Sequence, residues 1–269
     1  MTVNMTDYSE IQKLWKSYDI TTPEKLDKYL SNFRILFAYN SGKIENDHIT
    51  FNDTKEIFEN NKVLNYTGDA RTLFEQQNQK LCYEFLKSKI VNKEPLTIDL
   101  IKEIHRILTG GTYDERRYIE NGERPGEFKK HDYVVGEAEV GARPDEVSSQ
   151  LEDMLQEINA YSGNNHLTTA AYLHVNFEYI HPFADGNGRV GRTILNYYLM
   201  MHDEPPLIVF DEEKNLYYDA LKAFDLAENI VPLKKFLEME TIRTWSKTLE
   251  RIQVGTKQRK MHLYDNLGR

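Results

Sequence analysis

Residues 181–192 constrain this chain more than any other part of its 269-residue sequence. They read His-Pro-Phe-Ala-Asp-Gly-Asn-Gly-Arg-Val-Gly-Arg, and a run typical of a helix, from Thr193 to Met201, follows them. Pro182 fixes its own φ and disfavours helical geometry in the residue before it. The sequence therefore predicts a helix that ends at His181, a loop, and a second helix.

The loop between these two helices carries groups suited to a polyphosphate. A glycine-containing loop that opens a helix leaves first-turn N–H groups without partners, and such groups bind anions. Arg189 and Arg192 are three residues apart and would share one face of that first turn. His181 could transfer a proton and Asp185 could bind a metal ion. We therefore expect a functional site here rather than an ordinary turn.

A second hypothesis rests on the glycines alone. Gly186, Gly188 and Gly191 spell G-x-G-x-x-G, the pattern of dinucleotide-binding loops, and residues 173–179 alternate as a strand might. Three features weigh against an NAD-dependent oxidoreductase. Residues 181–185 separate the supposed strand from the glycines, Asp185 would repel a pyrophosphate, and no series of strand–helix units follows Phe210.

The stretch 181–192 resembles the signature of Fic-domain proteins, H-x-F-x-[DE]-G-N-G-R-x-x-R, at every specified position. The similarity extends from about residue 35 to about residue 240. Such enzymes mostly transfer AMP from ATP to a Ser, Thr or Tyr hydroxyl of a protein. The resemblance thus implies a protein adenylyltransferase acting on a target protein or on itself. A non-enzymatic, nucleotide-binding regulatory module is the third hypothesis.

The resemblance implies a role for each motif residue. His181 would accept the hydroxyl proton, and Asp185 would hold Mg²⁺ bound to ATP. The phosphates would contact the backbone at Gly186 and Gly188, and Asn187 would add a side-chain donor. Arg189 and Arg192 would clamp the β- and γ-phosphates. In the related Doc kinases a lysine stands where this chain has Gly188, so the glycine favours AMP transfer over phosphorylation.

The adenine site is implied less directly. Fic relatives place a tyrosine pair in the helix after the motif, matched here by Tyr217 and Tyr218. Many relatives carry Asn where this chain aligns Asp225, and an ionised Asp accepts hydrogen bonds but donates none. This departure leaves the base preference open, and core packing remains an alternative role for the tyrosines.

A second segment resembles the inhibitory signature [ST]-x-x-x-E-[GN] of Fic proteins that restrain themselves. Here it reads Ser41-Gly42-Lys43-Ile44-Glu45-Asn46. The resemblance implies that Ser41 and Glu45 belong to this segment and that Glu45 pairs with Arg192, displacing the γ-phosphate. In some relatives the same glutamate helps water to remove AMP from a modified protein, so one site could catalyse both the addition and the removal of AMP.

The apolar periodicity predicts a mainly α protein, and the resemblance implies the Fic fold, a bundle of about eight to ten helices. A helix is expected after Thr22, with an end or interruption at residues 40–42, and a short one at 53–59. A longer helix is expected at 69–91, with residues 73, 82, 85, 86 and 90 on its apolar side. The next helix begins after Thr97, and His105 in it is expected to be a core or hydrogen-bonded residue. Further helices are expected at 144–161, 167–180, 214–228 and 231–252. Short β-prone pieces at 127–131 and 133–135 predict a hairpin, implied to be a flap (about 126–136) that docks the target by strand addition.

We expect one Fic domain unit over residues 1–269. It would comprise N-terminal helices with the inhibitory segment (1–65), a catalytic core (66–240) and a basic C-terminal helix or tail (241–269). The net charge of −9 argues against nucleic-acid binding. No apolar run suits a membrane span, and Cys82 is the only cysteine, so a cytoplasmic setting is expected. The sequence leaves oligomerisation open.

Overall fold

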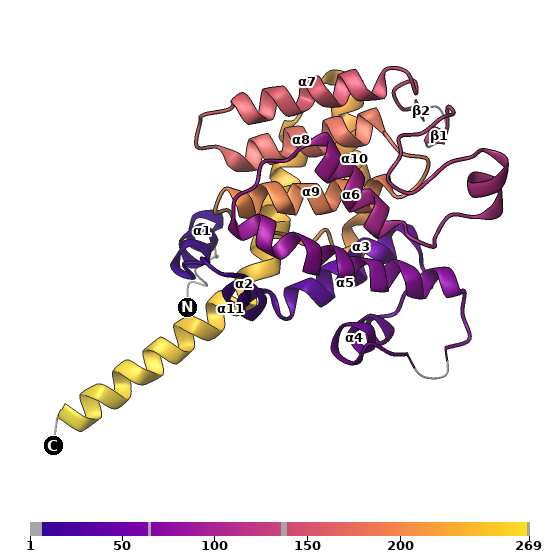
Figure 1. Cartoon of the computed structure of the whole chain (residues 1–269). Coiled ribbons are helices and arrows are strands. Elements are labelled where there is room, and N and C mark those ends of the chain that lie inside the picture. Colours follow the sequence, from indigo (N-terminus) through magenta and orange to yellow (C-terminus); the bar gives the residue numbers. More distant parts are fainter. Residues whose placement is uncertain (1–6, 64–65, 136–138, 268–269) are drawn as a thin grey trace.

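Helix dominates the structure, a computed structural model that describes residues 7–63, 66–135 and 139–267 (Figure 1). The α-helices in these ranges are α1 (Tyr8–Ser17), α2 (Pro23–Leu30), α3 (Phe33–Glu45), α4 (Phe51–Asn60), α5 (Ala70–Val91), α6 (Ile98–Leu108), α7 (Val147–Ala160), α8 (His166–Ile180), α9 (Asn187–Met201), α10 (Lys214–Ala227) and α11 (Val231–Leu267). A π-helix spans Arg116–Glu120 and a 3-10 helix spans Asp211–Glu213. The predicted mainly α fold class is confirmed.

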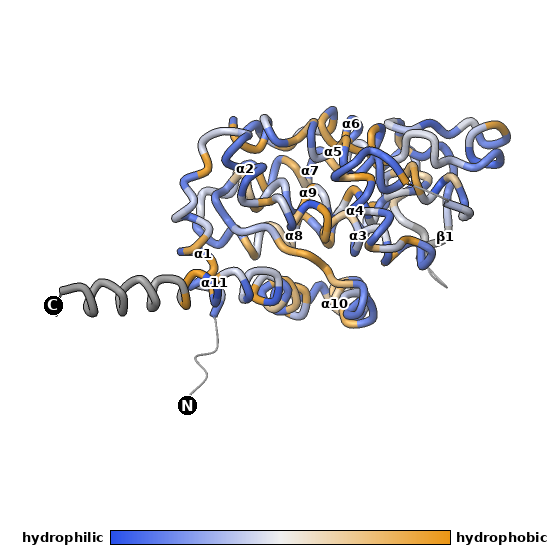
Figure 2. Tube along the Cα trace, turned by 90° about the horizontal axis from the view of Figure 1, so that it is seen from below, coloured by the Kyte–Doolittle hydropathy of each residue, from blue (hydrophilic) through white to orange (hydrophobic). Residues whose placement is uncertain are grey.

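Helix α9, which begins inside the glycine motif, lies in the middle of the bundle (Figure 1, Figure 2). Every residue of α9 from Arg189 to Met201 is buried. Helix α8 packs along it, and α3, α5 and α6 pack against its other sides. A helix that is buried all round has its orientation fixed by its neighbours. The side chains of the motif are therefore held on a rigid element.

Helix α8 ends where Pro182 predicts. His181 caps the helix in the left-handed conformation (φ 49°, ψ 60°), which is unfavourable for a residue with a Cβ atom. Two backbone hydrogen bonds hold the chain on either side of this residue. The N–H of Lys129 donates to the carbonyl of Pro182 over 2.9 Å, and the N–H of Ala142 donates to the carbonyl of Ile180 over 3.0 Å.

Helix α3 is continuous, so the predicted interruption at residues 40–42 is wrong. Gly42 lies where α5 approaches most closely, and a Cβ atom at this position would be 2.3 Å from Nε2 of Gln76. The glycine therefore permits close packing of two helices rather than ending one. Helix α3 continues to Glu45, so this residue occupies the last helical position.

Helix α5 buries polar side chains as well as apolar ones. Cys82, Leu86 and Ile90 are buried as predicted. The N-terminal half of the helix also buries five polar residues: Thr72, Glu75, Gln76, Asn78 and Gln79. Buried polar groups are stable only with partners, so this half of α5 belongs to a polar network rather than to the apolar core.

The predicted hairpin is shorter than expected and lies later in the chain. Val134–Val135 (β1) pairs antiparallel with Glu139–Val140 (β2). The piece predicted at 127–131 is not a strand, and residues 136–138 lie outside the described ranges. The backbone of Lys129 instead binds the motif loop, as noted above.

Helix α11 is longer than predicted, and its C-terminal part projects beyond the bundle (Figure 1). Helix α1, which the sequence patterns did not reveal, packs on α11 through Ile11, Leu14 and Trp15. Among the described residues, no helix combines the length and the apolar character that crossing a bilayer requires.

Candidate functional site

The motif loop is shaped by Gly186 and Asn187. Gly186 has φ +81°, and a Cβ atom there would lie 2.6 Å from Cγ2 of Thr109, so only glycine fits. The amide of Asn187 accepts a hydrogen bond from the N–H of Phe183 (3.0 Å) and donates one to its carbonyl (2.8 Å). Asn187 was predicted to donate to a phosphate. In the structure both ends of the amide hold the loop in shape, and the phosphate contact stays a prediction.

His105 packs against the motif loop and hydrogen-bonds to its backbone. Its ring stacks on Phe183 with centroids 3.7 Å apart. The N–H of Gly126 donates to Nδ1 over 2.8 Å, which leaves Nε2 to donate to the backbone carbonyl of Asp185 over 3.0 Å. Burial lowers the pKa of His105 to about 3, so the ring is uncharged. The prediction that His105 is a hydrogen-bonded core residue is confirmed.

His181 presents an uncharged imidazole to the site. Burial lowers its pKa most strongly, and the Lys129 ammonium lowers it further. The backbone of Glu178 and the carboxylates of Glu45 and Asp185 act in the opposite direction, and the pKa is about 4. An imidazole that is uncharged at neutral pH can accept a proton.

Asp185 is an ionised carboxylate surrounded by arginines. Its Oδ1 accepts a hydrogen bond from the N–H of Gly186 (2.7 Å), and its Oδ2 accepts one from Nη2 of Arg71 (2.8 Å). Burial raises its pKa, but the guanidinium groups of Arg189, Arg71 and Arg117 outweigh that effect and hold the pKa below its ordinary value. Arg71 and Arg117 come from outside the motif and were not predicted.

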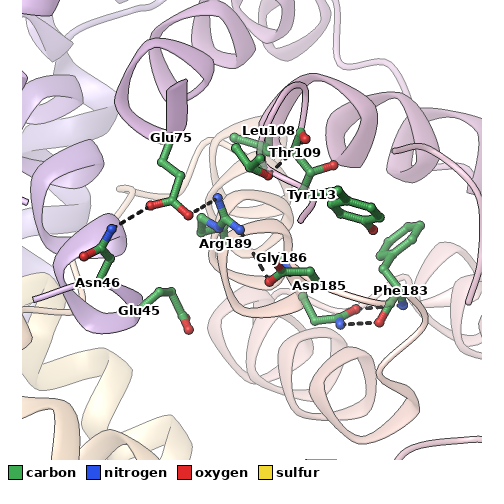
Figure 3. A network of polar contacts seen from close by, with 12 residues as sticks. Glu45, Asn46, Glu75, Leu108, Thr109, Tyr113, Phe183, Asp185, Gly186 and Arg189 are labelled. Carbon is green, nitrogen blue, oxygen red and sulfur yellow. Dashed lines mark hydrogen bonds and ion pairs between the residues drawn. The ribbon is translucent and has the colours of Figure 1, made fainter. Parts of the chain in front are cut away.

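Glu75 links the motif to the N-terminal helices (Figure 3). Its Oε1 lies 3.3 Å from Nη1 of Arg189 and 3.0 Å from Nε of Arg71. Its Oε2 accepts a hydrogen bond from Nδ2 of Asn46 over 3.1 Å. Nε and Nη1 of Arg189 are buried and form no hydrogen bond among the described residues, although Nη1 is within ion-pair distance of Glu75. This guanidinium therefore retains capacity for a further anionic partner.

Arg192 is bound by the last two turns of α3. Its Nε donates to the hydroxyl of Ser41 (3.0 Å), and its Nη2 donates to the Ser41 carbonyl (2.9 Å) and to Oε1 of Glu45 (2.8 Å). The side chain of Arg192 is 2% exposed, whereas that of Glu45 is 36% exposed. The fully buried arginine is thus fixed, and its carboxylate partner lies at the edge of the site.

A second buried cluster lies behind Arg192. Nε2 of His174 and the hydroxyl of Tyr217 are hydrogen-bonded at 2.7 Å, and Oε1 of Glu178 lies 4.0 Å from the same nitrogen. A Cβ atom on Gly191 would be 2.3 Å from that Oε1. Burial raises the pKa of Glu178 to about 7, although Arg192 opposes the shift, and burial lowers the pKa of His174 to about 3.

Most of the predicted site residues share one cavity of about 550 Å³. The predicted residues that line it are Glu45, His181, Asp185, Gly186, Asn187, Gly188 and Arg189. The lining residues that were not predicted are Asn46, Arg71, Glu75, Arg117, Tyr133 and Ala184. Ser41 and Arg192 do not line this cavity; they lie behind Glu45, with which Arg192 pairs.

The three residues predicted for an adenine site do not line this cavity either. Tyr217 is 1% exposed and hydrogen-bonded to His174, so its role is packing in the core, and its assignment to the base is corrected. Tyr218 is 42% exposed and contacts the Tyr217 ring, with centroids 5.3 Å apart. Asp225 lies on the exposed side of α10. Of the three, Tyr218 and Asp225 remain accessible to a ligand.

The donor set fits Mg²⁺ that arrives with a nucleotide. No group of three or more His, Cys, Asp or Glu side chains in the described ranges could hold a metal ion. Asp185 is a single ionised carboxylate on the cavity wall, and Mg²⁺ commonly uses one or two carboxylates together with substrate phosphates. The Asp185 carboxylate would have to exchange its ion pair with Arg71 for the metal ion.

The dinucleotide-binding hypothesis fails on the element that precedes the glycines. The G-x-G-x-x-G pattern requires a strand that leads directly into the turn. Residues 166–180 form helix α8 instead, and the alternation of apolar residues there lies within a helix buried on several sides. The extended segment after α9 is not paired with a strand among the described residues.

Comparison with known proteins points to one family. Residues 95–199 match the model of the Fic/DOC family. The chain is 29% identical to the protein adenylyltransferase Fic of Drosophila persimilis over 211 residues, which is 77% of this chain and 39% of that protein. The corresponding protein of Drosophila melanogaster is 28% identical over 211 residues, covering 77% of this chain and 40% of its own length. The chain therefore spans about two fifths of these relatives.

Solved structures share the fold over nearly the whole chain. A Fic domain containing signaling protein from Bacteroides thetaiotaomicron superposes with a TM-score of 0.77 at 24% identity, covering 90% of this chain and 94% of that one. Fic-1 (residues 134–508) from C. elegans superposes with a TM-score of 0.76 at 21% identity, covering 92% of this chain and 72% of that one.

Proposed function

We propose, from the match of residues 95–199 to the Fic/DOC family model, that the chain is a protein adenylyltransferase, which transfers AMP from ATP to a hydroxyl group of a protein. One observation carries the proposal. An uncharged imidazole (His181), an ionised carboxylate (Asp185) and a guanidinium with two nitrogen atoms that form no hydrogen bond among the described residues (Arg189) line one cavity at the N-terminus of α9. A proton acceptor beside a site for a polyanion is what nucleotidyl transfer to an alcohol requires.

The chemistry of the proposed step follows from these groups. The hydroxyl oxygen of the target attacks the α-phosphorus, a new P–O bond forms, and the bond between the α- and β-phosphates breaks. Pyrophosphate leaves with the electron pair of that bond, and the hydroxyl proton passes to a ring nitrogen of His181. Catalysis of this kind depends mainly on positioning and charge stabilisation. Arg189 and the free N–H groups at the start of α9 supply the positive potential.

Mg²⁺ would enter with ATP and be held by Asp185, where it would neutralise part of the triphosphate charge. The protein's own contribution is to keep this carboxylate ionised and oriented. The Gly186 N–H fixes one oxygen, and the Arg71 guanidinium keeps the other facing the cavity until it is exchanged.

We further propose that the enzyme inhibits itself through Glu45 and Ser41. Both bind the Arg192 guanidinium, which the resemblance assigns to the γ-phosphate. ATP that entered beside this ion pair would lack its terminal anchor and lie out of line for attack. The same carboxylate, at the edge of the cavity, is suited to activate water, so AMP removal belongs to the proposal as a second activity of the site.

The target protein is proposed to dock on the segment of about 126–136, beside His181. Within this segment the backbone of Lys129 contacts the motif loop, and the short strand β1 lies near the segment's C-terminal end. Self-modification would use the same site. The whole chain would act as one unit with the boundaries expected from the sequence.

Intact-mass spectrometry tests the proposal. The chain and its Glu45→Gly variant are incubated with ATP and MgCl₂, and a mass increase of one adenylyl group is expected, larger in the variant. His181→Ala in the same background should bind ATP, measured by titration calorimetry, yet gain no adduct. Binding without an adduct on the chain or on any protein of a cell lysate would instead support the nucleotide-binding module.

A further inference from the structure

Lys129 is a buried cation that the fold does not satisfy. It lies between α6 and β1 and is 2% exposed. Its Nζ atom is shielded from solvent and has no hydrogen-bond partner among the described residues. Burying an ammonium group without a partner is strongly unfavourable, and lysine is almost never fully buried in this way. Such a residue calls for a functional reason.

The side chain of Lys129 lies against His181. A Cβ atom built on Gly141 would be 2.5 Å from Cβ of His181 and 3.0 Å from Nζ of Lys129. Nζ of Lys129 therefore lies no farther from Cβ of His181 than the sum of these two distances. The backbone of Lys129 also binds the carbonyl of Pro182. One residue thus contacts the histidine turn through both its main chain and its side chain.

We propose that Lys129 is a positioning residue for His181, whose buried ammonium repels a proton from the imidazole and so keeps it ready to accept one from the substrate. This inference rests on the proposed function, in which His181 is the proton acceptor. A cation beside a buried imidazole disfavours its protonated form, because little water screens the repulsion.

The charged groups around His181 are consistent with this role. Glu45 from α3 and Asp185 from the motif loop both favour the imidazolium, and the backbone of Glu178 from α8 does so too. Lys129 acts against all three, together with burial, which is the larger effect. A protonated His181 would face this ammonium, and the repulsion between the two cations favours release of the proton, which regenerates the uncharged imidazole.

A matched pair of variants isolates the charge. Lys129→Met keeps an unbranched side chain of similar length and removes the cation, whereas Lys129→Arg keeps the cation. The pKa of His181 is measured in each protein by NMR titration of the imidazole signals, assigned by their loss in His181→Asn. We expect Lys129→Met to raise this pKa by about one unit or more, and Lys129→Arg to leave it within about 0.3 units.

Two further readouts separate this role from a structural one. In urea unfolding Lys129→Met should be at least as stable as the wild type, because an unpaired buried charge is removed. In AMP transfer the acidic limb of the pH–rate profile should move to higher pH in Lys129→Met and stay in place in Lys129→Arg. An unchanged His181 pKa in Lys129→Met overturns the inference. The NMR measurement needs no turnover, so a chain without transferase activity would refute the proposed function and still decide this question.

Discussion

Oε1 of Glu45 lies 2.8 Å from Nη2 of Arg192 and joins the last residue of α3 to the second turn of α9. Ser41, one turn earlier in α3, accepts hydrogen bonds from Nε of the same guanidinium and from the same Nη2. These contacts use donors that a terminal phosphate would need. A ligand that binds Arg192 must therefore displace Glu45, and the partial exposure of the Glu45 side chain allows that exchange.

The first prediction concerns this ion pair. Glu45→Gly should raise the initial rate of AMP transfer about tenfold or more, because a charge-assisted hydrogen bond contributes about 1.5–3 kcal/mol. Rates are compared at saturating ATP–Mg²⁺ with those of Glu45→Gln, which removes the charge and keeps the helix end. Combining Glu45→Gly with Arg192→Ala should return activity to a low level, since the two residues are in contact. A rate at or below that of the wild type would leave Glu45 without an inhibitory role.

The second prediction concerns Arg71, which occupies Oδ2 of Asp185. Arg71→Met should lower the Mg²⁺ concentration that gives half-maximal transfer by about threefold to tenfold, because a competing cation is lost. Arg106→Met is the control, since Arg106 pairs with Glu103 on the surface. A collapse of activity at saturating Mg²⁺ would show instead that Arg71 itself binds the nucleotide.

The third prediction concerns Glu75, which is 3% exposed and contacts two arginines. Glu75→Gln should lower the free energy of unfolding by about 2–4 kcal/mol, because it removes one of the two carboxylates that pair with these guanidinium groups in a buried setting. Glu84→Gln is the control: Glu84 forms half-exposed pairs with Arg34 and Lys87, and its loss should cost less than about 1 kcal/mol. Urea unfolding measures the free energy of unfolding of both variants, and an equal loss in the two would contradict a special role for Glu75. ATP should stabilise Glu75→Gln more than it stabilises the wild type.

The fourth prediction concerns pH and Glu178, whose pKa burial raises to about 7. The folded state then binds a proton that the unfolded state releases, so the contribution of Glu178 to stability is complete below about pH 4.5 and is lost as the pH rises through 7. Glu178→Gln should match the wild type at about pH 4 and exceed it by about 1–3 kcal/mol at about pH 8.5 in urea unfolding. A variant less stable than the wild type at pH 8.5 would mean that Glu178 is ionised and paired with Arg192.

Local signals in the sequence predicted the elements on which the site is built. Pro182 and Gly186 specify the end of α8 and the start of α9, because each restricts or permits particular backbone angles. Thr22 and Thr97 cap helices as predicted, through side-chain acceptors for first-turn N–H groups. These signals involve neighbours in sequence, so they can be read without knowing the fold.

Contacts between distant segments could not be read in this way. Arg71 and Glu75 look like residues of a solvated helix face, and only the approach of α9 buries them among the motif side chains. Gly42 looks like a helix end, but the side chain of Gln76 determines its use. Tyr217 was predicted in an adenine site by resemblance, and its depth in the core became apparent only from its contact with His174. The charge on buried Lys129 gave no sequence signal at all.

The burial of α3 has a consequence for how the site could open. Ile44 is 1% exposed, its carbonyl accepts a hydrogen bond from Nζ of Lys214 over 2.6 Å, and the N–H of Asn46 donates to the carbonyl of Gly42 over 2.9 Å. A helix packed in this way does not detach as a body. Besides rotation of the partly exposed Glu45 side chain, fraying of the final turn withdraws Glu45, so under the proposed self-inhibition the equilibrium constant for that fraying would contribute to the resting activity. Temperature, or a protein that captures the frayed turn, would then act as an activator, and the rate of deuterium uptake at the amides of residues 44–46 would report the active fraction.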